Sequence, residues 1–134
     1  MVAGCSRDPS YEKVFQHPMN EWEERAAKLS DQELVDAYVY GLNDRRPPVV
    51  LANPVAARGV PLFEAVAHLS IKQKDDYMMS SLMQIASRIE SKRAGSICGS
   101  RDAMALLAQA GTEMETAVIK RSFRDDLAGL CASE

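Results

Sequence analysis

Several features that mark common functional classes are scarce in this sequence. Aromatic residues make up 6% of the chain, and the longest basic clusters are the pairs Arg45-Arg46 and Lys92-Arg93. A nucleic-acid surface needs concentrated positive charge, whereas the formal net charge is -3. No apolar run approaches the ~18 residues of a membrane-spanning helix. We therefore expect neither a nucleic-acid partner nor a membrane-spanning segment.

Signatures of catalysis and metal binding are also missing. His17 and His68 are the two histidines; Glu64 precedes His68 by one helical turn, but a single such pair does not make a metal site. There is no Gly-x-Ser-x-Gly nucleophile turn and no glycine-rich phosphate loop. Acidic neighbours such as Asp125-Asp126 point in different directions on a helix and are poor acid–base pairs. We expect no catalytic residues, no metal and no cofactor.

The chain is instead rich in apolar and helix-forming residues. It has 134 residues, of which 46% are hydrophobic and 26% charged, and it contains seven Met. This length suits one domain that buries roughly two-thirds of its unfolded surface. The scarcity of β-branched runs favours packed helices over a sheet. The sequence therefore predicts an all-α fold of about six to seven helices in antiparallel pairs.

Apolar spacing and capping signals predict where these helices lie. Asn20 with Glu23, Ser30 with Glu33, and Thr112 with Glu115 have the spacing of capping boxes, which satisfy free backbone N–H groups at a helix start. Gly111 is expected to separate the last two helices. The predicted helices span 20–28, 31–42, 51–58, 61–69, 75–91, 101–110 and 113–131. Residues 1–19 are expected to form an arm that packs Phe15 on the body, and residues 20–134 a single helical domain.

The central helical pair resembles a known repeat family. The repeats called HEAT-like combine a proline-led helix, a turn with Asp, and a second helix with apolar, small and apolar residues. The match covers about one and a half repeats, and it departs from the family in the proline loop near residue 47 and in the linker around residue 98. It implies either a short solenoid or, as the alternative, a compact bundle. The matching residues are Pro61, Leu62, Leu69, Asp75, Asp76, Leu82, Ile85 and Ala86.

The beginning of the sequence resembles a second pattern. Val2-Ala3-Gly4-Cys5 is similar to the lipobox of bacterial lipoproteins, in which the Cys becomes the lipidated first residue. The sequence as given lacks the charged segment and apolar run that precede a lipobox in that family. The resemblance implies lipidation of Cys5, and therefore a periplasmic, membrane-anchored protein of a Gram-negative bacterium. The alternative is a cytoplasmic protein with a chance Cys.

The remaining cysteines fit the oxidising periplasm. With Cys5 lipidated, Cys98 and Cys131 form an even pair, as expected for a disulfide. A helical hairpin turning at Gly111 would bring the two residues level, because its arms measure about 28 Å and about 25 Å. We therefore predict a Cys98–Cys131 disulfide; two free buried thiols are the cytoplasmic alternative.

These features favour binding over catalysis. The main hypothesis is a lipid-anchored protein-binding module, one version of which is an immunity protein that neutralises a toxin acting in the periplasm. The alternative is an accessory protein or small hydrolase of the cell envelope. Charged loops on a rigid helical scaffold suit recognition. The predicted partner-binding residues are Asp44, Arg45, Arg46, Lys72, Lys74, Asp75 and Asp76.

Overall fold

The computed structural model describes residues 11–40 and 51–132, and within these ranges every regular element is helical. The predicted all-α class is confirmed. Cys5, Asp44, Arg45 and Arg46 lie outside the described residues. In chain order the elements are η1 (Tyr11–Phe15), η2 (Met19–Glu21), α1 (Trp22–Ala26), α2 (Asp31–Tyr40), α3 (Ala52–Ala57), α4 (Val60–Gln73), α5 (Asp76–Lys92), α6 (Arg101–Glu113) and α7 (Ala117–Leu130).

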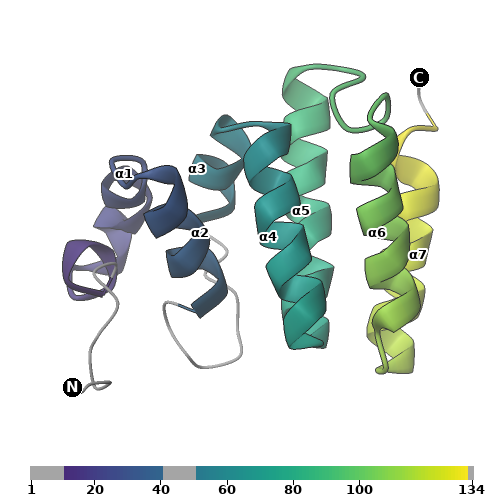
Figure 1. Ribbon diagram of the computed structural model, residues 1–134, viewed down its shortest axis with the longest axis horizontal. Helices are drawn as coiled ribbons and strands as arrows, with labels where there is room; N and C mark the ends of the chain where they lie inside the picture. Colours follow the sequence, from purple (N-terminus) through teal and green to yellow (C-terminus); the bar gives the residue numbers. More distant parts are fainter. Residues whose placement is uncertain (1–10, 41–50, 133–134) are drawn as a thin grey trace.

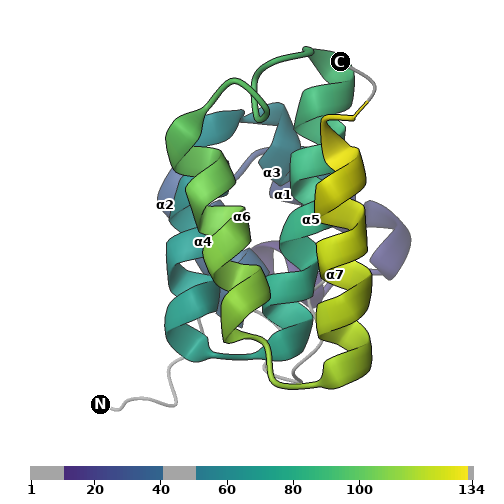
Figure 2. The same ribbon diagram turned by 90° about the vertical axis from the view of Figure 1, so that its right-hand side faces the viewer.

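Helices α2 to α7 form two layers. Helices α2, α4 and α6 pack side by side in one layer, and α3, α5 and α7 pack side by side in the other (Figure 2). The pairs α4–α5 and α6–α7 are antiparallel hairpins that bridge the layers (Figure 1). As a result α5 and α7 run parallel to each other as neighbours.

The core lies between these layers. On α5 the apolar residues predicted to share one face are all buried, from Met78 through Leu82 and Ile85 to Ile89. Phe63 of α4 is fully buried as well. At the N-terminal end, Phe15 is buried and meets Trp22 edge to face with ring centroids 4.9 Å apart. Its predicted packing on the body is confirmed.

Of the two capping boxes predicted in the first half of the chain, one is confirmed and one is wrong. Ser30 and Glu33 form the reciprocal capping box, with the Glu33 N–H donating to Ser30 Oγ at 3.2 Å and the Ser30 N–H donating to Glu33 Oε1 at 3.0 Å. Asn20 instead lies inside the turn η2, and α1 begins at Trp22 without a side-chain cap. The short 3-10 turn after Pro18 moves the helix start beyond Asn20.

The predicted boundary between the last two helices is also wrong. Helix α6 continues through Gly111 to Glu113. Gly111 is buried, and a Cβ at this position would lie 3.4 Å from Phe123 Cδ2. This glycine allows close approach of α6 and α7 rather than breaking a helix. Thr112 donates to the Ala108 carbonyl at 3.1 Å, within α6, so the Thr112–Glu115 capping box does not form.

Candidate functional site: a groove between α5 and α7

A disulfide bond joins the end of the last helix to the loop between α5 and α6. Cys98, in the loop between α5 and α6, forms a disulfide with Cys131, the C-cap of α7, and their Cα atoms are 5.8 Å apart. This confirms the predicted pairing. The bond holds the end of α7 against the loop that follows α5.

A buried carboxylate organises that loop. Glu90, in the last part of α5, accepts hydrogen bonds from the backbone N–H groups of Gly95 (2.6 Å), Ile97 (2.8 Å) and Cys98 (3.0 Å). Burial raises the pKa of Glu90, but these three donors outweigh it, and the net pKa lies below the usual value. The ionised side chain thus holds Cys98 in place for the disulfide. Sequence analysis missed this residue because its partners belong to an irregular loop.

The other end of α7 is also fixed by a carboxylate. Asp76, at the start of α5, accepts hydrogen bonds from the backbone N–H groups of Glu115 (3.1 Å) and Thr116 (2.6 Å), immediately before α7. Burial raises the pKa of Asp76, but its bonds to Thr116 and Glu115 and the nearby Lys120 outweigh it and bring the net pKa below the usual value. Thr116 makes no side-chain cap of its own, so Asp76 supplies the acceptor from a neighbouring helix.

The predicted partner-binding residues of the central turn lie together at one end of the α4–α5 hairpin. Lys72 is exposed in the last turn of α4, and Lys74 follows with a left-handed φ of 56°. Asp75 caps α5 by accepting from the N–H groups of Tyr77 (2.9 Å) and Met78 (3.1 Å). Both carboxylates therefore have structural partners, and the two lysines are free to face solvent. Partner binding by this turn stays a prediction.

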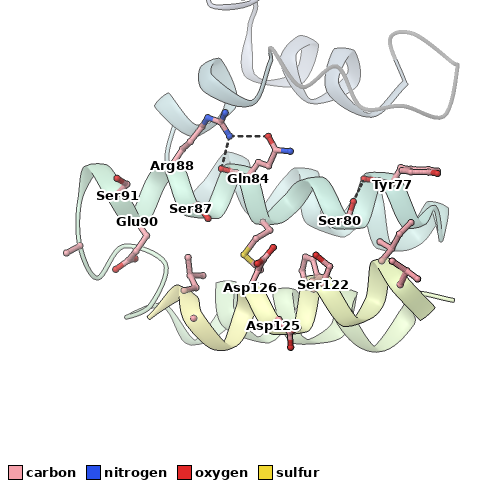
Figure 3. A pocket seen from close by; sticks show the side chains of 17 residues that line it. Tyr77, Ser80, Gln84, Ser87, Arg88, Glu90, Ser91, Ser122, Asp125 and Asp126 are labelled. Carbon is pink, nitrogen blue, oxygen red and sulfur yellow. Dashed lines mark hydrogen bonds between the residues drawn. The ribbon is translucent and has the colours of Figure 1, made fainter. Parts of the chain in front are cut away.

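A larger feature, missed by sequence analysis, lies between α5 and α7. This groove, which we call the α5–α7 groove, has a volume of about 1250 Å³. Its floor is apolar, with Met83 and Phe123 nearly buried beneath it. Ser122 and Asp126 point from α7 toward α5 (Figure 3). The lining residues are Tyr77, Ser80, Met83, Gln84, Ser87, Arg88, Glu90, Ser91, Ala94, Val118, Ile119, Ser122, Phe123, Asp125, Asp126, Gly129 and Leu130.

Exposed apolar side chains gather at one end of the groove. Three large apolar residues are strongly exposed in the described part of the chain: Met19, Tyr77 (56%) and Val118 (78%). Tyr77 and Val118 both line the groove, at the end where Asp76 joins α5 to α7. Exposed apolar patches mark protein-binding surfaces, and tyrosine is enriched among the residues that contribute most to binding.

The charges around the groove are unevenly distributed. Asp126 points toward α5, and the side chain of Asp125, which also lines the groove, points away from α5 (Figure 3); within residues 11–40 and 51–132 neither forms a salt bridge. Arg88 is the one cation in the lining, and it points away from α7 and donates to the Gln84 carbonyl at 3.2 Å. Lys120 and Arg124 line a separate depression on the α6 side of α7. The α7 wall of the groove is therefore acidic.

The lining does not provide a recognisable catalytic set. Its serines have no histidine, lysine or cysteine beside them among the residues that line the groove. In the part of the chain that the structure describes, no group of three or more His, Cys, Asp or Glu residues could hold a metal ion. No described helix is both long and apolar enough to cross a membrane. The groove can offer apolar contact, hydroxyl groups and negative charge.

Comparisons with known proteins add no relative. No protein-family model matches the chain, and searches of the curated proteins and of the solved structures found no match to it.

Proposed function

We propose that this chain is a non-enzymatic protein-binding module whose partner docks in the α5–α7 groove. The observation that carries the proposal is the exposure of both Tyr77 and Val118 on the lining of one groove. When a partner covers these two solvated apolar side chains, the binding free energy becomes more favourable by about 25 cal/mol per Å² of apolar surface removed from water. The neighbouring serines and Asp126 would then supply polar contacts.

The arrangement of the helices supports this role. In HEAT-like repeats, stacked helical pairs create an extended surface from the helices of one layer. Helices α3, α5 and α7 pack side by side in one layer, and this layer carries the groove. We propose that the resemblance found around Pro61 and Asp75 reflects this kind of scaffold. The charged turn at Lys72 and Lys74 would then lie beside the binding surface and contact an acidic part of the partner.

We place this module in the periplasm, as a lipoprotein anchored through Cys5. The Cys98–Cys131 disulfide supports this location, because structural disulfides persist mainly in oxidising compartments. The proposed partner is a protein that acts in the periplasm, and an immunity protein that neutralises a toxin is the concrete version. No observation at the groove favours the alternative of a small envelope hydrolase.

The binding proposal is tested by photo-crosslinking in native cells. A photoreactive amino acid replaces Ser122, which is exposed in the groove, or Gln109, which is exposed on α6 and serves as the matched control. We expect one partner to be crosslinked from position 122, and the crosslink to be lost when Val118→Asp is added. Equal crosslinking from both positions, or none from position 122, contradicts the proposal.

The compartment is tested separately. Protein isolated from native cells is alkylated without reduction and analysed by mass spectrometry. We expect Cys98 and Cys131 to be protected from alkylation and Cys5 to carry lipid. Free thiols at Cys98 and Cys131 would contradict a periplasmic location.

A further inference from the structure

We infer that the segment that occupies the α5–α7 groove is an amphipathic α-helix with lysine or arginine along one side. This inference rests on the proposed function and specifies the chemistry of the partner. It follows from the shape of the groove, from the side chains along its walls, and from the sign of its charge.

The shape of the groove fits a helix. Its walls are two parallel helices, and the α5 wall extends from Tyr77 to Ser91. At 1.5 Å per residue this span is about 21 Å, which equals about four turns of a helix laid alongside. Side chains recur along α5 at Tyr77, Ser80, Gln84, Ser87 and Ser91, with alternating spacings of three and four. This is the spacing with which one helix meets another in knobs-into-holes packing.

The small size of the wall residues permits close approach. Ser80 and Ser87 on α5 lie one heptad apart, as do Ser122 and Gly129 on α7. At Gly129, a Cβ would meet nothing within 4 Å, so this position is open to a partner. Short side chains let helix axes come closer together than long ones do. The apolar anchors would be Tyr77 and Val118 at one end, with Met83 and Phe123 beneath.

Other common modes of peptide recognition lack their requirements here. Addition of a β-strand needs an exposed sheet edge, and the described residues contain no strand. Proline-rich segments dock between exposed aromatic side chains. Of the two aromatic residues in this lining, Tyr77 is exposed but Phe123 is only 3% exposed. The mode that the groove favours is a helix in a groove.

The charge of the groove determines which charged residues the partner helix should carry on the side that faces α7. Asp126 faces the space between α5 and α7, the side chain of Asp125 points away from α5, and Glu90 is already bonded to the loop after α5. The single cation in the lining, Arg88, points away from α7. A helix that carries Lys or Arg beside α7 would compensate the charge of Asp126, whereas an acidic helix would be repelled.

Selection from a display library of random 16-residue peptides tests this inference without assuming a sequence. We expect the enriched peptides to have apolar residues spaced by three and four, and Lys or Arg on one flank. Binding should weaken about tenfold or more in Ser87→Trp, which fills the groove from an exposed position. It should weaken about threefold in Asp126→Asn and decrease with added salt. Gln109→Trp, on the exposed surface of α6, is the control and should bind as the wild type does.

Two results would overturn the inference. One is enrichment of proline-rich, acidic or aperiodic peptides. The other is binding that Ser87→Trp leaves unchanged. The crosslinking experiment separates this failure from failure of the proposed function: a partner crosslinked at position 122 through an extended or acidic segment refutes the helix but leaves the binding role intact. Absence of any partner at position 122 refutes the binding role itself.

Discussion

Helices α5 and α7 are neighbours in one layer, but they are held in place by different means. Nine of the 17 residues of α5 are buried, whereas Phe123 is the single buried residue among the 14 of α7. Helix α5 is therefore held along its whole length by apolar contact. Helix α7 packs on the core through Phe123 and through the partly buried Ile119, Leu127 and Leu130, and it is also fixed at its two ends, where Asp76 binds the backbone before it and Cys131 closes the disulfide after it.

This difference explains how a groove can exist between them. A helix with a broad apolar face draws its neighbour into close contact and fills the space between with side chains. Because α7 is fixed at its ends, its middle can carry Ser122 and Asp126 toward α5 without loss of the fold. The binding surface on α7 is thus supported by Asp76 and Cys131, which do not line the groove themselves.

The largest effect is expected from the core of α5. Leu82 is fully buried, and Leu82→Ala should reduce the free energy of unfolding by about 3 to 5 kcal/mol, because it removes apolar contacts and leaves a cavity. Ser87→Ala, at an exposed position of the same helix, is the control and should change stability by less than about 0.5 kcal/mol. Urea unfolding measures both. Similar losses in the two variants would contradict the burial-based account of α5.

The disulfide should have the next largest effect. It joins residues 33 positions apart, and in the chain-entropy model Cys98→Ser with Cys131→Ser costs about 3 to 4 kcal/mol. Hydrogen exchange should show faster exchange in α7 than in α5 of this variant, because α7 loses one of its two fixed ends. Uniform acceleration across α5 and α7 would show that the two helices are stabilised in the same way.

A smaller effect is expected from Glu90. Glu90→Gln keeps the size of the side chain but replaces a charged acceptor of three backbone hydrogen bonds with a neutral one. We expect a loss of about 1 to 2 kcal/mol and faster reduction of the disulfide by dithiothreitol, because Cys98 is less well held. Wild-type reduction kinetics in this variant would show that the loop is rigid without the carboxylate.

The smallest effect on stability is expected from Asp76, and it depends on pH. The pKa of Asp76 is lowered in the folded protein, so its stabilisation is present above the unfolded-state pKa and is lost as the pH falls through the folded-state pKa. Asp76→Asn should therefore be less stable than the wild type near pH 7 by about 1 kcal/mol or less, since the site is partly exposed, and the difference should shrink in acid. Urea unfolding across this pH range measures it. A difference that is constant with pH would exclude the ionised carboxylate as the cause.

Local signals in the sequence predicted local structure well. The Ser30–Glu33 capping box and the apolar face of α5 follow from residues a few positions apart, where helical geometry alone determines which atoms meet. Asn20 and Gly111 were misinterpreted because each residue is common at helix ends, but its neighbours in space decide its role. For Gly111 the deciding neighbour is Phe123 of the next helix.

The candidate site was the least predictable part. Tyr77 and Val118 are 41 positions apart in the sequence, and each alone is an ordinary exposed residue on its helix. Asp75 and Asp76 were predicted to bind a partner because they are charged and adjacent to a turn. In the structure both accept hydrogen bonds from backbone N–H groups. The donors to Asp75 lie within α5, and the donors to Asp76 lie immediately before α7. Because Asp76 and its donors belong to distant segments of the chain, no regular residue spacing in the sequence indicates their contact.

The sequence by itself determined that this protein is helical and where most of its helices lie, because periodicity and capping are properties of short segments. The number of cysteines and the lengths of the predicted helices also indicated that Cys98 and Cys131 can pair. The tertiary structure decided which helices lie side by side and which side chains remain exposed between them. Packing places α7 parallel to α5, with Asp76 and the disulfide as its fixed ends. The α5–α7 groove exists because of that placement, since its two walls come from separate hairpins.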